Sequence, residues 1–141
     1  ACLNPRMRVI DIIAEGIDIH KLAKNKQERE EKVYKILEAV GLSKDHAGRY
    51  PHEFSGGQRQ RIGIARALIT NPEFIIADEP TGNVDPNMSY EIVSLLTEIN
   101  KKGTTILMVT HDHNLVRDFK HRVIMLDSGR IVADTMGGDA V

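Results

Sequence analysis

The stretch FSGGQRQRIGIARAL, residues 54–68, predicts a helix with an unusual beginning. Ser55 precedes two glycines and is a good N-cap. Apolar residues then recur on one helical face at Ile62, Ala65 and Ile69. Glycines at a helix start leave backbone N–H groups open to an anion, and the helix dipole favours negative charge there. We expect the nearby Arg59 and Arg61 to help hold such an anion. The residues by themselves leave two interpretations open: an anion-binding loop, or an ordinary capped helix after a Gly-Gly turn.

The residues that precede this stretch predict further helices. Residues 8–20, RVIDIIAEGIDIH, form one, and the polar residues 21–31 after them are typical of a solvated surface. A second helix is expected where apolar residues recur at i, i+3, i+4 and i+7, followed by a glycine at the C-cap position. These residues are Val33, Ile36, Leu37, Val40 and Gly41. We therefore expect residues 1–70 to form a helical domain.

The residues that follow alternate between strands and helices. FIIA, residues 74–77, is a short continuous apolar run of the kind found in strands buried on both faces, and TTILMVT, residues 104–110, predicts a second such strand. Near the end of the chain, RVIMLD and RIVAD are joined by Ser128-Gly129, which indicates a hairpin. This order predicts an α/β fold with a parallel core, and we expect residues 71–141 to form a partial α/β core.

Composition limits the kinds of partner. The 141 residues carry 19 basic and 20 acidic side chains and a net charge of −1, whereas proteins that coat nucleic acid are usually basic, so we expect no nucleic-acid partner. One cysteine, Cys2, allows no disulfide within the chain and fits a reducing compartment. The sequence shows no signal peptide and no apolar run long enough to span a bilayer, so we expect a soluble protein without direct membrane insertion.

Carboxylates gather after the first predicted strand. Asp78 and Glu79 stand at its C-terminal end, where parallel sheets bind ligands. A carboxylate there can hold Mg²⁺, and its neighbour can orient or deprotonate a water molecule. Asp85 and Pro86 then suit the start of the next helix. The alternative interpretation is that Asp-Glu only begins a polar loop.

One histidine follows the second predicted strand. His111 ends the run VTHD, and if the two strands are neighbours it lies at the same sheet edge as Glu79. A histidine there could hydrogen-bond a phosphate oxygen, although an ordinary loop histidine has the same sequence signal. No His/Cys spacing resembles a zinc site.

The motifs occur together and in order, and together they resemble those of the ATP-binding cassette (ABC) ATPases. FSGGQ resembles the signature motif of that family, FIIADE its Walker B segment, GNVD its D-loop and THD its switch-histidine loop. The resemblance covers nearly the whole chain. It implies a P-loop NTPase-like fragment with an N-terminal helical subdomain and a partial parallel sheet that lacks the Walker A strand.

The resemblance implies roles for eight residues. ABC ATPases work as head-to-tail pairs of nucleotide-binding domains with ATP between them. The residues implied to face the nucleotide or the opposite domain are Ser55, Gly56, Gly57, Gln58 and Asp85.

The other three roles concern the reaction. The resemblance implies that Asp78 holds the Mg²⁺ shell, that Glu79 acts on the attacking water and that His111 senses the γ-phosphate. This chemistry is phosphoryl transfer, in which positioning and charge neutralisation do most of the catalysis. The cofactors implied for the parent domain are ATP and Mg²⁺.

One expected motif is absent from the sequence. No G-x-x-x-x-G-K-[ST] occurs in the 141 residues, and the beginning, ACLNPRM, resembles the stretch that follows the Q-loop of the family. The P-loop supplies the N–H groups and the lysine that neutralise the phosphates. We therefore expect this chain to be about the second half of a nucleotide-binding domain, and to be inactive by itself.

The family also implies partners and a location. The parent couples Mg-ATP hydrolysis to transport, with a second nucleotide-binding domain and transmembrane subunits as partners. It is cytoplasmic and peripheral at the inner face of the membrane. A chain that lacks central strands is expected to expose apolar faces and to self-associate.

The two halves of the chain resemble different members of the family. The N-terminal part is similar to oligopeptide and dipeptide importer ATPases, and the part from ADEPTGNVD onward is similar to the cell-division ATP-binding protein and lipoprotein-exporter ATPases. A hybrid joined between about residues 56 and 80 and the divergence of one natural protein both stay open. The rival to an ATPase fragment is an engineered or recombined, non-catalytic scaffold. A DNA-repair type ATPase is disfavoured by the near-neutral charge and by the lack of a coiled-coil insertion.

Overall fold

The computed structural model describes residues 3–82 and 84–137. Asn83, the second residue of the predicted GNVD motif, and Cys2 lie outside the described residues. The chain divides into two compact units, Ala1–Met108 and Val109–Val141, and each is described by itself.

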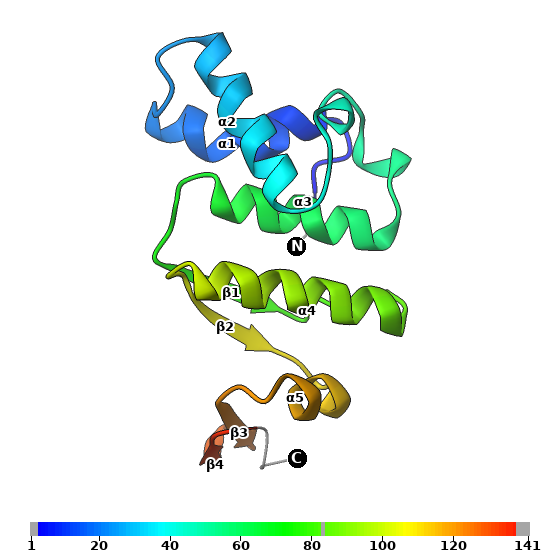
Figure 1. Cartoon of the computed structure of the whole chain (residues 1–141), viewed down its shortest axis with the longest axis vertical. Coiled ribbons are helices and arrows are strands. Elements are labelled where there is room, and N and C mark those ends of the chain that lie inside the picture. The colour runs from blue at the N-terminus through cyan, green and yellow to red at the C-terminus, as the bar shows by residue number, and fades with distance from the viewer. Residues whose placement is uncertain (1–2, 83, 138–141) are drawn as a thin grey trace. The chain divides into compact units, whose positions relative to one another are not determined.

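The first unit is helical up to residue 68 and then alternates between strands and helices (Figure 1). This order confirms the sequence-based α/β prediction. The elements are α1 (Val9–His20), α2 (Lys26–Ala39), the short 3₁₀ turns η1 (Lys44–His46) and η2 (Pro51–Glu53), α3 (Gly56–Leu68), β1 (Phe74–Asp78), α4 (Pro86–Lys101) and β2 (Thr105–Val109).

The helices of the first unit share one hydrophobic core. Helix α3 packs against α1, α2 and α4, and Figure 1 shows it between the pair α1–α2 and α4. Fully buried side chains come from all four helices: Ile12, Ile13, Ile17, Val33, Leu37, Ile62 and Ile92. The apolar faces predicted from helical periodicity are therefore the faces that form the core.

The helix ends follow the capping residues. The Ser55 side chain accepts a hydrogen bond from the Gln58 N–H and begins α3, and the Asp85 side chain accepts from the Met88 N–H and begins α4. Gly41 follows α2 with a φ of +80°, which glycine adopts without a steric penalty. Both predicted N-caps and the position predicted for the glycine are confirmed.

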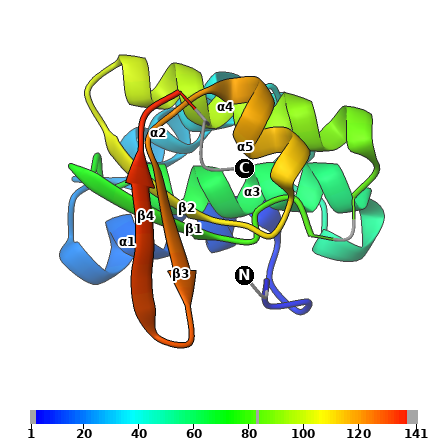
Figure 2. The same ribbon diagram turned by 90° about the horizontal axis from the view of Figure 1, so that it is seen from below.

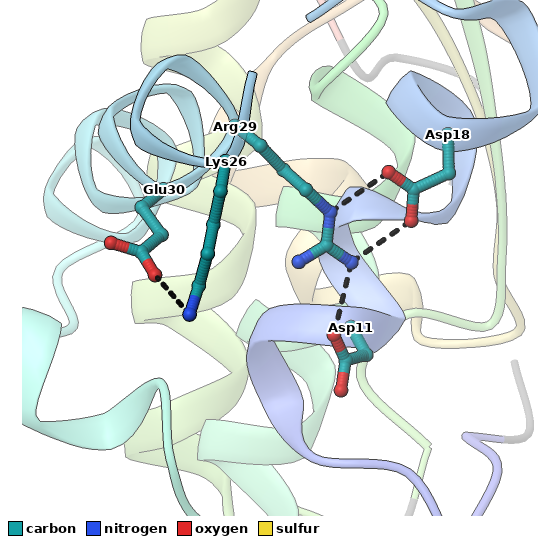
Figure 3. Close-up of polar contacts among 5 residues, drawn as sticks. All are labelled: Asp11, Asp18, Lys26, Arg29 and Glu30. Carbon is teal, nitrogen blue, oxygen red and sulfur yellow. Dashed lines mark hydrogen bonds and ion pairs between the residues drawn. The ribbon is translucent and has the colours of Figure 1, made fainter.

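An arginine ties α2 to α1. The Arg29 guanidinium donates from Nε to Asp18 Oδ1 at 2.8 Å, and from one terminal nitrogen to Asp18 Oδ2 and Asp11 Oδ1 at 2.9 Å each (Figure 3). Bidentate arginine–carboxylate geometry is among the stronger forms of ion pair. The hydrogen bond from Arg29 holds the pKa of Asp18 below its ordinary value. This contact joins the two helices at their solvent-exposed edge.

Strands β1 and β2 form a two-stranded sheet. The Thr105 N–H donates to the Glu73 carbonyl at 2.9 Å, at the start of both strands, so the strands run in the same direction and α4 is their crossover connection. Ile106 and Met108 pack against the core. The prediction of a parallel pair is confirmed.

The prediction that both strands are buried on both faces is wrong for this chain. Phe74 is 51% exposed, Ile76 65% and Leu107 46%, whereas Ile75 between the first two is buried. The physical reason is that the described residues cover one face of the sheet, the face toward the helical core. The other face presents apolar side chains to solvent.

The second unit holds a short helix and a hairpin. Helix α5 (His113–Phe119) begins at Asp112, whose side chain accepts from two backbone N–H groups. Strands β3 (Val123–Asp127) and β4 (Arg130–Thr135) pair antiparallel, with an irregularity between Met125 and Leu126. The hairpin predicted at Ser128-Gly129 is confirmed, and both turn residues have positive φ. Figure 2 shows the two strands side by side.

Within residues 3–82 and 84–137, no helix has both the length and the apolar character needed to cross a bilayer.

The first prediction concerns Arg29. Replacing it by Gln (Arg29→Gln) should lower the free energy of unfolding by about 1 kcal/mol at pH 7, because a bidentate but half-exposed pair is lost. The folded-state pKa of Asp18 lies below its unfolded value, so this contribution is present above about pH 4 and is lost as the pH falls through the folded pKa. Urea unfolding at pH 7 and pH 3 measures the difference.

Lys26→Gln is the matched control, because Lys26 is on the same helix and its 3.9 Å contact with Glu30 involves a side chain that is 87% exposed (Figure 3). It should change the free energy of unfolding by less than about 0.5 kcal/mol. An Arg29→Gln effect that is the same at both pH values, or no larger than the control, would contradict the role of this ion pair.

The second prediction concerns the exposed face of β1 and β2. Apolar sheet faces associate in water, so the chain should self-associate across about a tenfold range of low micromolar concentration. Phe74→Lys combined with Ile76→Lys should make it monomeric in sedimentation velocity, whereas Ile19→Lys, at an exposed isoleucine of α1, should not. A monomeric unmodified chain throughout that range would show that this face does not drive association.

Candidate functional site

The start of α3 is a closed capping box. The Gln58 N–H donates to Ser55 Oγ at 3.2 Å, and the Ser55 N–H donates to Gln58 Oε1 at 3.0 Å. The two glycines between them form the first turn, where backbone N–H groups have no intrahelical acceptor. Ser55 is exposed and Gly57 is buried. The sequence FSGGQ therefore builds a capped helix start in which the Gln58 amide is bonded to Ser55, and the glycine amides are the ones available to an anion.

Two arginines were expected to assist an anion at this helix start. Arg59 instead donates from its guanidinium to the Phe54 carbonyl of the preceding loop. Arg61 donates to the Val40 carbonyl at 2.8 Å and pairs with Glu91 at 3.3 Å. Arg61 therefore joins the end of α2 to α4, and the helix dipole and backbone amides are what the helix start offers to an anion.

The start of α4 lies close to the start of α3. The two helices run in the same direction in both views (Figures 1 and 2), and the side chain of Met88, in the first turn of α4, lies against Gly57. Asp85 caps α4 by accepting the Met88 N–H at 3.0 Å. The structure thus brings the first turn of α4, which Asp85 caps, against Gly57, although about thirty residues separate the two helix starts in the sequence. Met88 carried no functional signal in the sequence.

Asp78 and Glu79, at the end of β1, differ in their exposure to solvent. Asp78 is the last residue of the strand and its side chain is exposed. Glu79 has a φ of +48°, in the left-handed region that costs an ordinary residue on the order of 1 kcal/mol. The Gly82 N–H donates to the Glu79 carbonyl at 3.0 Å and closes the turn. Glu79 Oε1 is shielded from solvent. This backbone bend gives the adjacent carboxylates different environments.

His111 belongs to the second unit. It is exposed, and it stands just before Asp112, the cap of α5. All other residues proposed for the site lie in the first unit. The chain therefore divides the proposed machinery between the two units.

The carboxylate at the end of β1 fits Mg²⁺ held mainly by a nucleotide. Within the described ranges, no group of three or more His, Cys, Asp or Glu side chains gathers that could hold a metal. Nucleotide-bound Mg²⁺ keeps several waters and takes one or two protein carboxylates together with substrate phosphates. A single exposed carboxylate such as Asp78 matches that donor set.

Comparisons with known proteins agree on one family. A family model described as ABC transporter matches residues 1–82. The oligopeptide transport ATP-binding protein OppF of Bacillus subtilis is 57% identical over 133 residues, which are 94% of this chain and 44% of OppF. The cell division ATP-binding protein FtsE of Streptococcus pneumoniae is 44% identical over 137 residues, 97% of this chain and 58% of FtsE. Both kinds of relative match across nearly the whole chain.

Solved structures show the same fold. The ATP-binding cassette MJ0796, in a dimeric post-hydrolysis state bound to ADP and Pi, superposes with a TM-score of 0.82 at 33% identity, over 95% of this chain and 58% of that one. The chain spans less than half the length of OppF and somewhat more than half of MJ0796.

The third prediction concerns the helix start. Adding sulfate should shift the amide resonances of Gly56 and Gly57. The dissociation constant should be millimolar, which corresponds to a binding free energy of about −4 kcal/mol, as expected for a site made of one helix end. The matched control is the start of α4, where Pro86 lacks an N–H and the Asp85 carboxylate repels anions, so the Asn87 amide should stay in place. Glycine resonances that stay fixed while those of β2 move would refute the anion-binding interpretation.

Proposed function

Because the chain belongs to the ABC transporter family, we propose that it is part of a nucleotide-binding domain that couples Mg-ATP hydrolysis to transport. The observation that carries the proposal is the start of α3: a serine-capped Gly-Gly turn that presents backbone amides, held in the same unit as Asp78 and Glu79. That pair of features suits a phosphate and its metal ion.

The residues at the helix starts would bind phosphate across a domain pair. Ser55, Gly56 and Gly57 would contact the γ-phosphate of a nucleotide held by an opposite domain, with Gln58 fixed beside them by the capping box. Asp85 would reach toward the opposite domain from the adjacent start of α4. The shared direction of α3 and α4 supports these roles, because both helix starts face the same way (Figure 1).

The end of β1 would carry the hydrolytic step. The Mg-bound nucleotide would supply the phosphoryl group and part of the charge neutralisation when bound. Asp78 would hold the ion through its exposed carboxylate, and Glu79 would orient the attacking water and accept its proton. His111 would donate a hydrogen bond to a phosphate oxygen.

The chain by itself should not turn over ATP. Its 141 residues contain no G-x-x-x-x-G-K-[ST], so the lysine and the amide cradle that neutralise the phosphates would come from another part of the domain. The proposed partners are a second nucleotide-binding domain, or a second copy of this chain, together with transmembrane transport subunits. The relative MJ0796 is dimeric in its solved structure, which supports the first of these. Such an assembly would place the chain in the cytoplasm, at the inner face of the membrane.

The fourth prediction tests catalysis in a complete domain. The matching 133-residue segment of Bacillus subtilis OppF can be replaced by the corresponding part of this chain. This chimera should release phosphate from Mg-ATP, and Glu79→Gln should lower kcat about 100-fold or more, the loss expected when a general base is removed. Glu73→Gln, at an exposed acid just before β1, is the matched control and should leave kcat unchanged within about twofold.

The chain alone serves as the second control. Its phosphate release under saturating Mg-ATP should fall far below about one per second, the low end for enzymes. The proposal would be contradicted if the isolated chain turned over ATP at that rate and Glu79→Gln abolished this turnover. An active chimera in which Glu79→Gln has no effect would contradict it as well.

A further inference from the structure

A side chain at Gly57, in the first turn of α3, would have to displace the side chain of Met88. A Cβ placed there would overlap the Met88 Cε methyl and would lie 3.6 Å from both the Cγ and the Sδ atoms of the same side chain. The Met88 thioether therefore lies directly on the backbone of the glycine loop. Gly57 is buried, and the three heavy atoms nearest to such a Cβ all belong to Met88.

The backbone of the same methionine holds the Asp85 carboxylate. The Met88 N–H donates to Asp85 Oδ1 at 3.0 Å, and one residue later Ser89 Oγ donates to the Asp85 carbonyl at 3.1 Å. Met88 thus touches Asp85 through its amide and Gly57 through its side chain.

We propose that Met88 is a positioning residue that couples Asp85 to the glycine loop. A displacement of Asp85 moves the first turn of α4, and the Met88 side chain passes that displacement to Gly57 and so to the amides of the α3 start. This inference rests on the proposed function for its biological meaning, because it links a residue proposed to reach an opposite domain with residues proposed to contact phosphate. The coupling itself is a property of this chain and is measured without nucleotide.

The packing explains why a large, unbranched apolar side chain suits this position. Methionine adapts its three side-chain torsions to an irregular surface, and the missing Cβ of the glycine lets its side chain pack closely on the backbone. A shorter side chain would leave a gap between the two helix starts, and the motion of one would no longer press on the other. Leucine keeps most of the volume and should keep most of the coupling.

The coupling is measured by amide chemical shifts in the full 141-residue chain. Asp85→Ala removes the cap of α4 and should shift the Gly57 and Gln58 amides. In the Met88→Ala background the same substitution should shift them by less than half as much, and in the Met88→Leu background the effect should be largely restored. Met136→Ala, at an exposed methionine of the second unit, is the matched control and should leave the Asp85→Ala effect unchanged.

A second measurement needs no variant. With ¹³C-methyl methionine, the Met88 methyl should show an NOE to the Gly57 Hα protons, and its absence would overturn the proposal even if Met88→Ala fails to fold. Equal Asp85→Ala shifts in the presence and absence of the Met88 side chain would overturn it as well. So would a lack of any Asp85→Ala effect on Gly57 and Gln58.

The OppF chimera separates this proposal from the proposed function. Met88→Ala should lower kcat about tenfold while KM for ATP changes less than about twofold, and Met88→Leu should restore kcat, since a misplaced residue costs transition-state contacts more than ground-state binding. A purely structural role would lower the thermal midpoint without this split, and that result would reject the positioning role. An inactive chimera would count against the proposed function, and the amide shifts would still decide the coupling.

Discussion

The first unit depends on the buried face of α3. Ile62 and Ala65 are fully buried, and the helix contacts α1, α2 and α4 at once. Burying one isoleucine side chain contributes about 1.5–3 kcal/mol, so this face supplies a large part of the free energy that holds four helices together. The same helix begins with the Ser55 capping box. The position of the proposed phosphate contacts is therefore fixed by the hydrophobic core and not by a loop.

The starts of α3 and α4 form one rigid edge of this core. Each is capped by its own side chain, Ser55 or Asp85, and Met88 fills the space between them. Sites built on helix ends hold their geometry better than sites on mobile loops. Phosphoryl transfer requires such precision, because positioning and charge neutralisation account for most of its catalysis. This arrangement gives the nucleotide-binding interpretation its physical support.

Much of this organisation could be predicted from the sequence, because it rests on local signals. Ser55 and Asp85 as caps, the apolar periodicity of α2 and the hairpin at Ser128-Gly129 depend on residues a few positions apart. Tertiary contacts and exposure could not be predicted in this way. The contact between Gly57 and Met88 joins two helices, and the left-handed φ of Glu79 depends on the turn that follows it.

Phe74 also shows that exposure could not be predicted from the sequence, because its apolar surroundings predicted burial and the structure exposes it. A continuous apolar run indicates that a strand is suited to burial on both faces, but it does not say that this chain supplies the cover. Arg61 is a further case: its sequence position suggested an anion contact, and its guanidinium joins Val40 to Glu91 instead. The hydrogen-bond partners of a long side chain depend on which groups the tertiary structure brings near it, and sequence spacing alone does not predict them.

The central claim is that one helix, α3, both holds the core and presents the glycine loop. Native-state hydrogen exchange of the whole chain tests it most directly, because the slowest amides report the last part of a structure to open. The account predicts that the amides of Ile62–Leu68 exchange slowest in the first unit, through the opening that also exposes α1 and α4. Exchange of these amides as fast as those in the exposed hairpin β3–β4, while α1 and α4 stay protected, would contradict it.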